Sequence, residues 1–370
     1  MPNLYTARLR HAQHYLEVLR TAENLYLKGG DSNTQGLALF DLERANIEHG
    51  QMWTSENVKN DDIAQACNLY PGVSWNVISL RLHPRQQIRW MKDALNAAQQ
   101  LKHREAEGVH LGNLGLAHAA LGEPRKAIEY MEQALIIMRE IEDRQGEGNT
   151  LGNLGNAYGD LGETRKEIEY HEQALIIHRE IGDRRGEGNA LGNLGNASAA
   201  LNETRKAIEY HEQALNVMRD IGDKRAEGSI LGNLGNAYAR LGETRKAIEF
   251  YEQRLTIAHE IGDRRGESNA LGSFGNAYAR LDETRKAIEY HEQALNVMRD
   301  IEDRRGESNA LFNMSLALDK LGERTKAMKS AEAALKIYEA IEDPHAGMVR
   351  EQLAEWQSST DRGEKKSWEV

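Results

Sequence analysis

The chain has 370 residues, 40% of them apolar, and a formal net charge of −11. Nucleic acids and anionic membranes attract basic surfaces, so this acidic balance argues against both and favours protein ligands or self-association. Its single cysteine, Cys67, excludes a disulfide framework, and the sequence has neither a membrane-spanning apolar run nor a signal-peptide pattern, so we expect a cytoplasmic protein.

Helices are expected in the first part of the chain. Apolar side chains recur at helical spacing over residues 4–28, 37–53 and 63–82. Gly29 and Gly30 end the first helix, and Pro71 with Gly72 is expected to break the third. We assign residues 1–67 to an N-terminal helical region.

The rest of the chain repeats with a period of 40 residues. The motif Leu-Gly-Asn-Leu-Gly begins at Leu111, Leu151, Leu191 and Leu231, and variants begin at Leu271 and Leu311. We assign residues 68–347 to one degenerate and six clear repeats, and 348–370 to a closing helix with a disordered charged tail from Asp361. Repeats that stack on their neighbours predict an elongated solenoid.

Each repeat resembles a tetratricopeptide repeat (TPR). In the fourth, Leu234-Gly235-x-x-Tyr238 precedes Ala247-x-x-x-Tyr251, although Leu231 stands where Trp is common. The long repeat is similar to those of Pins-type adaptors, kinesin light chains and the sensor repeats of bacterial signalling ATPases and MalT-like regulators. The resemblance implies an all-α fold: a right-handed TPR superhelix, or α-solenoid, preceded by a short N-terminal helical bundle.

The N-terminal region adds a second resemblance. Arg10 to Leu16, Leu39 to Ile47 and Trp53 are similar to the helical junction before the sensor repeats of those ATPases and regulators. In those proteins a nucleotide-binding domain lies upstream, whereas this sequence contains no phosphate-binding G-x-x-x-x-G-K-[ST] motif. The chain is therefore either a free-standing relative or a piece of a larger protein.

Glycines inside the predicted helices need a physical reason. Gly232 and Gly235 each cost about 1 kcal/mol relative to Ala, and we expect them to allow close approach of a neighbouring helix. A phosphate-cradling role is disfavoured, because the spacing is wrong and no strand precedes them. At the turns, Gly242 and Gly262 suit left-handed caps and Thr244 suits capping the following helix.

Catalysis and metal binding find little support. His171, His211 and His291 each precede a glutamate, but Leu175, Leu215 and Leu295 stand where a zinc helix needs its second histidine. Equivalent positions hold Met131 and Tyr251, which favours packing between helices. No nucleophile and base pair can be nominated, so we expect no enzyme, no cofactor and no metal.

A polar stripe follows the first helix of each repeat, where positions 0, 4, 7 and 11 share one face. Its candidate ligand-binding members are Asn149, Asn153, Asn156, Asn189, Asn193, Asn196, Asn233, Asn236, Arg240, Asn269, Asn276, Arg280, Asn309, Asn313 and Lys320. By resemblance this face lines the concave groove, where related repeats use asparagines to hold an extended peptide backbone. Alternatively, some of these amides only join neighbouring helices.

The last position of the stripe becomes basic in the later repeats. Arg240, Arg280 and Lys320 follow Ala120, Asp160 and Ala200 at this position. We expect them to attract acidic side chains or a free C-terminus of a bound segment, unless they pair with neighbouring glutamates. The sequence thus predicts a non-enzymatic scaffold or sensor that binds a protein or peptide, or alternatively the regulatory domain of a STAND-type ATPase or transcriptional regulator.

Overall fold

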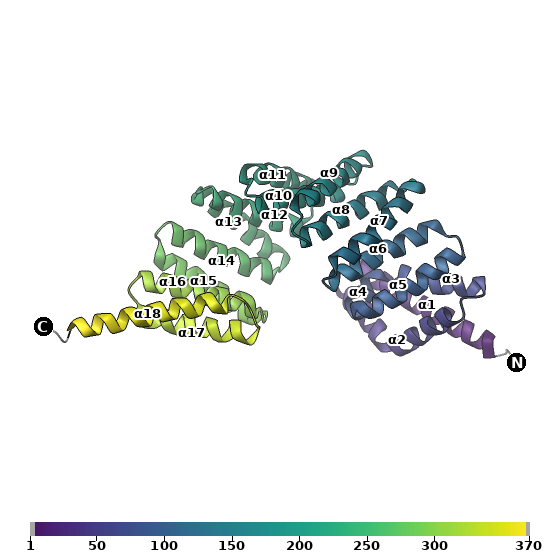
Figure 1. The fold of residues 1–370 in the computed structure, drawn as a ribbon, viewed down its shortest axis with the longest axis horizontal. Coiled ribbons are helices and arrows are strands. Elements are labelled where there is room, and N and C mark those ends of the chain that lie inside the picture. Colours follow the sequence, from purple (N-terminus) through teal and green to yellow (C-terminus); the bar gives the residue numbers. More distant parts are fainter. Residues whose placement is uncertain (1–3, 368–370) are drawn as a thin grey trace. The chain divides into compact units, whose positions relative to one another are not determined.

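A computed structural model describes residues 4–367, with side chains to residue 358, and all its regular elements are helices (Figure 1). They are α1 (Leu4–Lys28), α2 (Asp31–Glu56), α3 (Asp61–Gly72), α4 (Trp75–Arg81), α5 (Pro84–Gln100), α6 (Arg104–Ala120), α7 (Pro124–Glu140), α8 (Arg144–Asp160), α9 (Thr164–Glu180), α10 (Arg184–Ala200), α11 (Thr204–Asp220), α12 (Lys224–Arg240), α13 (Thr244–Ile261), α14 (Arg264–Arg280), α15 (Thr284–Asp300), α16 (Arg304–Lys320), α17 (Arg324–Ala340) and α18 (Ala346–Ser367). The all-α repeat fold expected from the sequence is confirmed.

The chain divides into two compact units, residues 1–190 and 191–370. In each unit the helices of the repeats are antiparallel neighbours in chain order (Figure 1). The first helices of the six clear repeats are α6, α8, α10, α12, α14 and α16, and the second helices are α7, α9, α11, α13, α15 and α17. Leu231, Leu234 and Ala247 of the repeat motif are fully buried, which explains why these positions are apolar in repeat after repeat.

The N-terminal helices form their own apolar core around Tyr70 and Trp90, whose rings meet edge to face. The Tyr70 hydroxyl donates a 2.7 Å hydrogen bond to the carbonyl oxygen of Ala12, which ties α3 to α1. As expected from Pro71, the third predicted helix ends at Gly72 and restarts as the short α4. The predicted domain boundary between residues 67 and 68 falls inside α3, and the division into domains stays a prediction.

The turns between helices follow the sequence, with one exception. Gly242 (φ 82°) and Gly262 (φ 66°) adopt the left-handed conformation that ends a helix. Asp263 caps the next repeat, because its Oδ1 accepts a 2.9 Å hydrogen bond from the Gly266 N–H. The expectation for Thr244 is wrong: it is the first residue of α13 and is buried, and Glu243 occupies the cap position without a side-chain bond.

The second glycine of each Leu-Gly-Asn-Leu-Gly motif lies directly beneath a large side chain of the second helix. A Cβ added to Gly195 would lie 2.4 Å from the His211 ring, and one added to Gly235 would lie 2.3 Å from the Tyr251 ring. A residue with a Cβ does not fit there unless its neighbours move, so the packing explanation for this glycine is confirmed. In the sixth repeat both residues of the pair are small, since Ser315 replaces the glycine and Ala331 replaces the large side chain.

The first glycine of the motif lacks this constraint in most repeats. An added Cβ would meet nothing within 4 Å at Gly192 or at Gly272. Gly232 is different, because its Cβ would lie 2.3 Å from Nη1 of Arg254, a mostly buried arginine that replaces an alanine of the other repeats. A close contact thus exists at the first glycine only in the fourth repeat, and there the neighbour is the end of a flexible side chain.

A buried glutamate joins each of several repeats to the next. Glu227, which is 5% exposed, accepts hydrogen bonds from Arg219 Nε at 2.8 Å and Lys224 Nζ at 2.9 Å. Arg219 belongs to the last turn of α11, whereas Lys224 and Glu227 belong to the first turn of α12. Equivalent glutamates with arginine partners are Glu147, Glu187 and Glu307. The pairing satisfies the carboxylate that burial would otherwise destabilise.

The last helix is longer than expected. α18 continues to Ser367, so the irregular tail predicted from Asp361 is helical over its first seven residues, 361–367. Glu364, Lys365 and Lys366 are good helix formers, which agrees with this extension. The rest of that predicted tail, residues 368–370, lies outside the described residues.

The glycine contact predicts opposite effects for two alanine substitutions in one motif. Gly195→Ala should lower the free energy of unfolding by about 1–3 kcal/mol, because the new Cβ overlaps His211. Gly192→Ala should raise it by up to about 1 kcal/mol, because Ala is the better helix former and the space is open. Urea unfolding followed by circular dichroism measures both, and His211→Ala should restore stability to Gly195→Ala. Equal effects of the two single changes would refute this explanation.

Repeat deletion tests the period. Removing residues 228–267 joins Glu227 to Ser268 in the same helical register, so the shortened chain should unfold cooperatively and stay soluble. Removing residues 228–247 joins the start of a first helix to a second helix and should abolish cooperative unfolding. Circular dichroism and urea titration distinguish the two, and similar behaviour of both deletions would be inconsistent with the repeat boundaries.

Candidate functional site

The polar stripe lies on one face of the first helices and is largely accessible. Its exposure repeats from helix to helix: the first, third and fourth positions are exposed, and the second is half-buried. The exposed members are Asn149 and Asn156 on α8, Asn189 and Asn196 on α10, Asn236 and Arg240 on α12, Asn269, Asn276 and Arg280 on α14, and Asn309 and Lys320 on α16. The half-buried members are Asn153, Asn193, Asn233 and Asn313.

Half-buried amides join neighbouring first helices. Nδ2 of Asn233 donates to Oδ1 of Asn196 at 3.0 Å, which links α12 to α10. Nδ2 of Asn313 donates to Oδ1 of Asn276 at 3.2 Å, which links α16 to α14. For these two amides the structure supports the helix-joining alternative, because each uses one of its N–H donors in a bond between helices.

In the fifth repeat a serine interrupts this ladder. Ser273 occupies the position of Asn233 and is too short to reach the preceding helix in the same way. The hydroxyl of Tyr251 instead donates a 2.8 Å hydrogen bond to Oδ1 of Asn236. A different residue thus satisfies the same acceptor.

These bonds orient the exposed amides of residues 191–370. The Oδ1 atoms of Asn196, Asn236 and Asn276 each accept a bond from within the protein. Each exposed NH₂ group can then donate to a ligand. A carboxamide without internal partners offers a ligand both a donor and an acceptor, whereas the internal bonds leave this row better suited to ligand oxygens.

Other members of the stripe are engaged differently. Oδ1 of Asn309 accepts a 2.6 Å bond from the Tyr338 hydroxyl, and Oδ1 of Asn149 accepts a long bond of 3.5 Å from Gln145 on its own helix. Asn189 and Asn269 are exposed at the N-terminal ends of their stripes. The structure therefore brings together Asn196, Asn233, Asn236 and Arg240, and next to them Asn276 and Arg280.

The three basic side chains at the end of the stripe find different partners. Nη1 of Arg240 donates to the carbonyl oxygen of Ala199 at 3.0 Å, and Nη1 of Arg280 donates to that of Ala239 at 2.7 Å. Lys320 forms an ion pair with Asp282 and lowers the pKa of that carboxyl group by hydrogen bonding. The alternative of pairing with acidic neighbours thus holds for Lys320, whereas both arginines bond to main-chain oxygens in the preceding first helix.

Two recesses open between successive first helices of residues 191–370. One, of about 250 Å³, lies between α10 and α12 and includes Asn196, Asn233 and His211. The other, of about 230 Å³, lies between α12 and α14 and includes Tyr251, Asn276 and Arg280. Asn236 and Arg240 line both recesses, so the two are neighbours on one polar face.

Second-helix side chains that the sequence did not assign to the site line these recesses. His211 is 2% exposed, and its Nδ1 has no hydrogen-bond partner among the described residues. Burial lowers its pKa to about 4, so the imidazole is neutral at pH 7. Burial likewise raises the pKa of Tyr251. The sequence shows that this second-helix position is His, Tyr or Met in different repeats. It does not show that the polar atoms of these side chains line the recesses.

A metal centre finds no support in the geometry. Across the described part of the chain, no group of three or more His, Cys, Asp or Glu side chains is placed to hold a metal ion. His171, His211 and His291 pack under the helix glycines Gly155, Gly195 and Gly275. Their positions are therefore explained by packing between helices.

The geometry agrees with comparisons to known proteins. The tetratricopeptide repeat profile matches residues 105–180, 147–220, 186–260, 226–300 and 266–340, which together cover more than half of the chain. The chain therefore belongs to the tetratricopeptide repeat family. No curated protein matches the sequence.

Several solved structures share the fold. Aspartyl phosphate phosphatase F of Bacillus subtilis is 11% identical, with a TM-score of 0.62 over 93% of this chain and 97% of that one. The apo quorum sensor NprR of B. thuringiensis is 13% identical, with a TM-score of 0.55 over 93% and 98%. A signal transduction ATPase with numerous domains (STAND) that carries a tetratricopeptide repeat sensor, from Pyrococcus horikoshii, is 18% identical, with a TM-score of 0.58.

The similarity to the STAND protein covers 87% of this chain but only 54% of that protein. At these identities the likeness shows the fold alone. Within the described residues, no helix is both long enough and apolar enough to cross a membrane.

Buried histidines predict acid sensitivity. His171, His211 and His291 have pKa values lowered by burial to about 4. The unfolded chain, with ordinary values near 6.5, binds protons first, so stability that is present above about pH 6.5 is lost as the pH falls toward 4. Each histidine should lower the free energy of unfolding by about 2 kcal/mol when the pH falls from 7 to 5.

The matched variant replaces all three histidines by Met, the residue at position 131 of the first clear repeat. Urea unfolding at pH 7 and pH 5 should show a smaller loss of stability for this variant than for the parent chain. A parallel loss in the two proteins would mean that these histidines do not carry the acid sensitivity.

Proposed function

We propose that this protein is a non-enzymatic scaffold or sensor that binds an extended protein or peptide segment on the first-helix face. The observation that supports it most is the row of amide donors at Asn196, Asn236 and Asn276, placed one repeat apart and oriented by bonds from within the protein. The main-chain carbonyl oxygens of an extended segment can accept hydrogen bonds from such a row, whatever side chains the segment carries. A reducing cytoplasm fits the single buried cysteine, Cys67.

Charge suggests where acidic groups of the segment would lie. Arg240 and Arg280 line the two recesses and bond to main-chain carbonyls, which leaves further guanidinium donors for a carboxylate. An acidic side chain or a free C-terminus therefore fits the fourth and fifth repeats. Lys320 contributes less, because Asp282 already pairs with it. The name of the similar NprR structure, a quorum sensor, is compatible with a sensing role.

A second candidate function is the regulatory domain of a STAND-type ATPase. It is favoured by the likeness to the P. horikoshii protein, which extends over 87% of this chain and includes a repeat sensor by its name. Sequencing the transcript that contains this chain tests it. A phosphate-binding motif in the same or an adjacent reading frame would support the regulatory role, and its absence from both would remove this candidate.

Peptide selection followed by paired substitutions tests the first proposal. Random linear peptides displayed on phage are selected for binding to the full chain. The dissociation constants of the selected peptides are then measured by fluorescence anisotropy. Arg240→Ala with Arg280→Ala should weaken binding by about tenfold at low salt and less at high salt. Asn236→Ala with Asn276→Ala should weaken it by about fivefold or more at any salt, because neutral donors are lost.

Matched controls lie on the second helices. Arg205→Ala with Arg245→Ala removes the same charge from α11 and α13, and Asn216→Ala removes an exposed amide from α11. These should leave affinity unchanged. If neither site pair alters the affinity by more than about twofold, roughly 0.4 kcal/mol, the first-helix face is not the binding site.

A further inference from the structure

In four of the six clear repeats, a ring of the first helix stacks on a ring of the second helix. The pairs are His118 with Tyr130, Tyr158 with Tyr170, Tyr238 with Phe250 and Tyr278 with Tyr290, with ring centres 5.2–5.3 Å apart and planes within 13° of parallel. These stacks fill the space between the two helices of a repeat near the turn that joins them.

A lysine one turn before the second ring lies over several of these stacks. The Nζ atoms of Lys166, Lys246 and Lys286 lie 4.7, 3.9 and 5.0 Å from the ring centres of Tyr158, Tyr238 and Tyr278. This distance is typical of a cation–π contact. Each such position thus combines two rings with a cation above them.

The sixth repeat has lost both rings but kept the lysine. Leu318 stands at the position of Tyr278, and Ser330 stands at the position of Tyr290. The third repeat, by contrast, has lost only the first ring, since Ser198 stands at its position and Tyr210 keeps the second ring. Lys326, the equivalent of Lys286, pairs with Glu323 at 2.5 Å.

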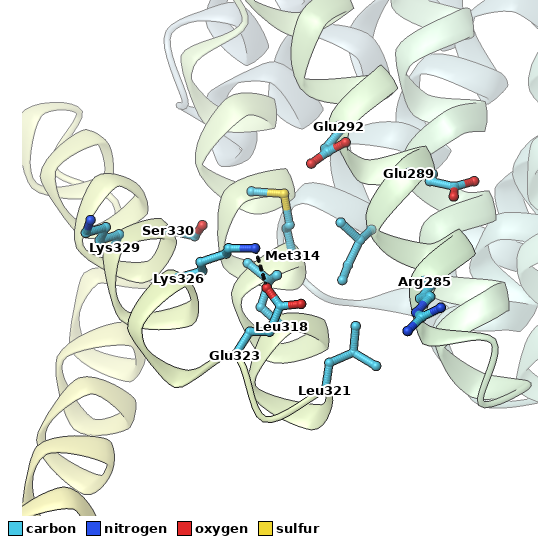
Figure 2. A pocket seen from close by; sticks show the side chains of 11 residues that line it. Arg285, Glu289, Glu292, Met314, Leu318, Leu321, Glu323, Lys326, Lys329 and Ser330 are labelled. Atoms are coloured by element: carbon cyan, nitrogen blue, oxygen red, sulfur yellow. Dashed lines mark ion pairs between the residues drawn. The ribbon is translucent and has the colours of Figure 1, made fainter.

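A pocket of about 540 Å³ opens where the two rings are missing. Its apolar part is formed by Ile288, Met314, Leu318 and Leu321. Figure 2 shows Met314 and Leu318 between two sets of polar side chains, with Lys326, Lys329 and Ser330 of α17 on one side and Arg285, Glu289 and Glu292 of α15 on the other. The volume lies within the range of small-ligand pockets, about 300–1,000 Å³.

The charge on one wall of the pocket is also reversed. Position 329 is lysine, whereas the five preceding repeats have glutamate there, at residues 129, 169, 209, 249 and 289. Lys329 is exposed and lines the pocket beside Ser330, with no ion-pair partner among the described residues. The loss of the ring and the reversal of charge therefore occur at adjacent residues of one helix.

We propose that this pocket binds an aromatic side chain of a partner polypeptide that carries an acidic residue next to it. The partner's ring would occupy the space that Tyr278 and Tyr290 fill in the fifth repeat. Met314 offers a thioether at a position where sulfur–aromatic contacts are favourable, and Lys326 lies where its equivalents contact a ring. Lys329 then pairs with the neighbouring carboxylate.

This site is separate from the first-helix face. None of its residues belongs to the polar stripe, and it uses apolar burial where the stripe uses amide hydrogen bonds. A partner could therefore bind here whether or not the first-helix face binds a peptide, and the two proposals fail independently.

Capped dipeptides added to the full chain test the pocket directly. Acetyl-Trp-Glu-amide is titrated while the ¹³C-labelled methyl group of Met314 is followed by NMR, since a bound ring shifts this resonance. We expect a saturable shift, with affinity at least about threefold weaker for acetyl-Trp-Lys-amide and at least about tenfold weaker for acetyl-Leu-Glu-amide. Equal binding of the Trp and Leu peptides, or no saturable shift at all, would overturn the proposal.

Variants that rebuild the stack provide the complementary test. Leu318→Tyr with Ser330→Tyr restores the residues of the fifth repeat and should reduce binding of acetyl-Trp-Glu-amide by at least about tenfold, because the protein's own rings fill the pocket. Lys329→Glu, on the surface, should remove the preference for Glu over Lys beside the Trp. Ser198→Tyr makes the equivalent change in the third repeat and should leave binding unchanged.

Urea unfolding shows whether the double variant is folded. If it is not, the proposal is tested by the Lys329→Glu variant and by the weaker binding expected of acetyl-Leu-Glu-amide. Unchanged binding by a folded double variant would contradict the proposal. Sedimentation of the chain alone provides a last check: if the double variant dissociates an oligomer of the parent chain, the occupant is a second copy and the partner proposal is wrong.

Discussion

The close contact between a first-helix glycine and a second-helix side chain is the constraint on which the first five clear repeats depend. Gly195 against His211 and Gly235 against Tyr251 leave no room for even one methyl group. Such contact sets the distance between the two helices, and the buried leucines fill the space that remains. The sixth repeat departs from this pairing, because Ser315 stands in place of the glycine and Ala331 in place of the large side chain.

The same contact shapes the candidate site. Because the second-helix residue reaches the first-helix glycine, its polar atoms come close to the exposed face and line the recesses at His211 and Tyr251. Tyr251 even replaces an interrupted step of the asparagine ladder by donating to Asn236. A packing requirement and a potential binding surface thus share residues, so substitutions on this face need stability measurements beside binding measurements.

Functional information in a repetitive chain lies where a repeat departs from its neighbours. Ser273 changes which residue orients Asn236, and Arg240 and Arg280 introduce cations at a position that is Ala or Asp earlier. In the sixth repeat, Leu318 and Ser330 open a pocket that an aromatic stack fills elsewhere. The regular positions maintain the fold, and the fold by itself does not specify a ligand.

The sequence by itself determined the repeat period, the helices, the left-handed turns at Gly242 and Gly262 and the polar stripe, because these depend on local spacing and backbone preference. Only the tertiary structure decided how each polar side chain is used. Asn233 and Asn196 look alike in sequence, yet one joins two helices through its donor and the other keeps its donor exposed. Thr244 likewise looked like a cap but is buried. Hydrogen-bond partners and empty volume arise between residues about 40 positions apart, where no local pattern specifies which atoms meet.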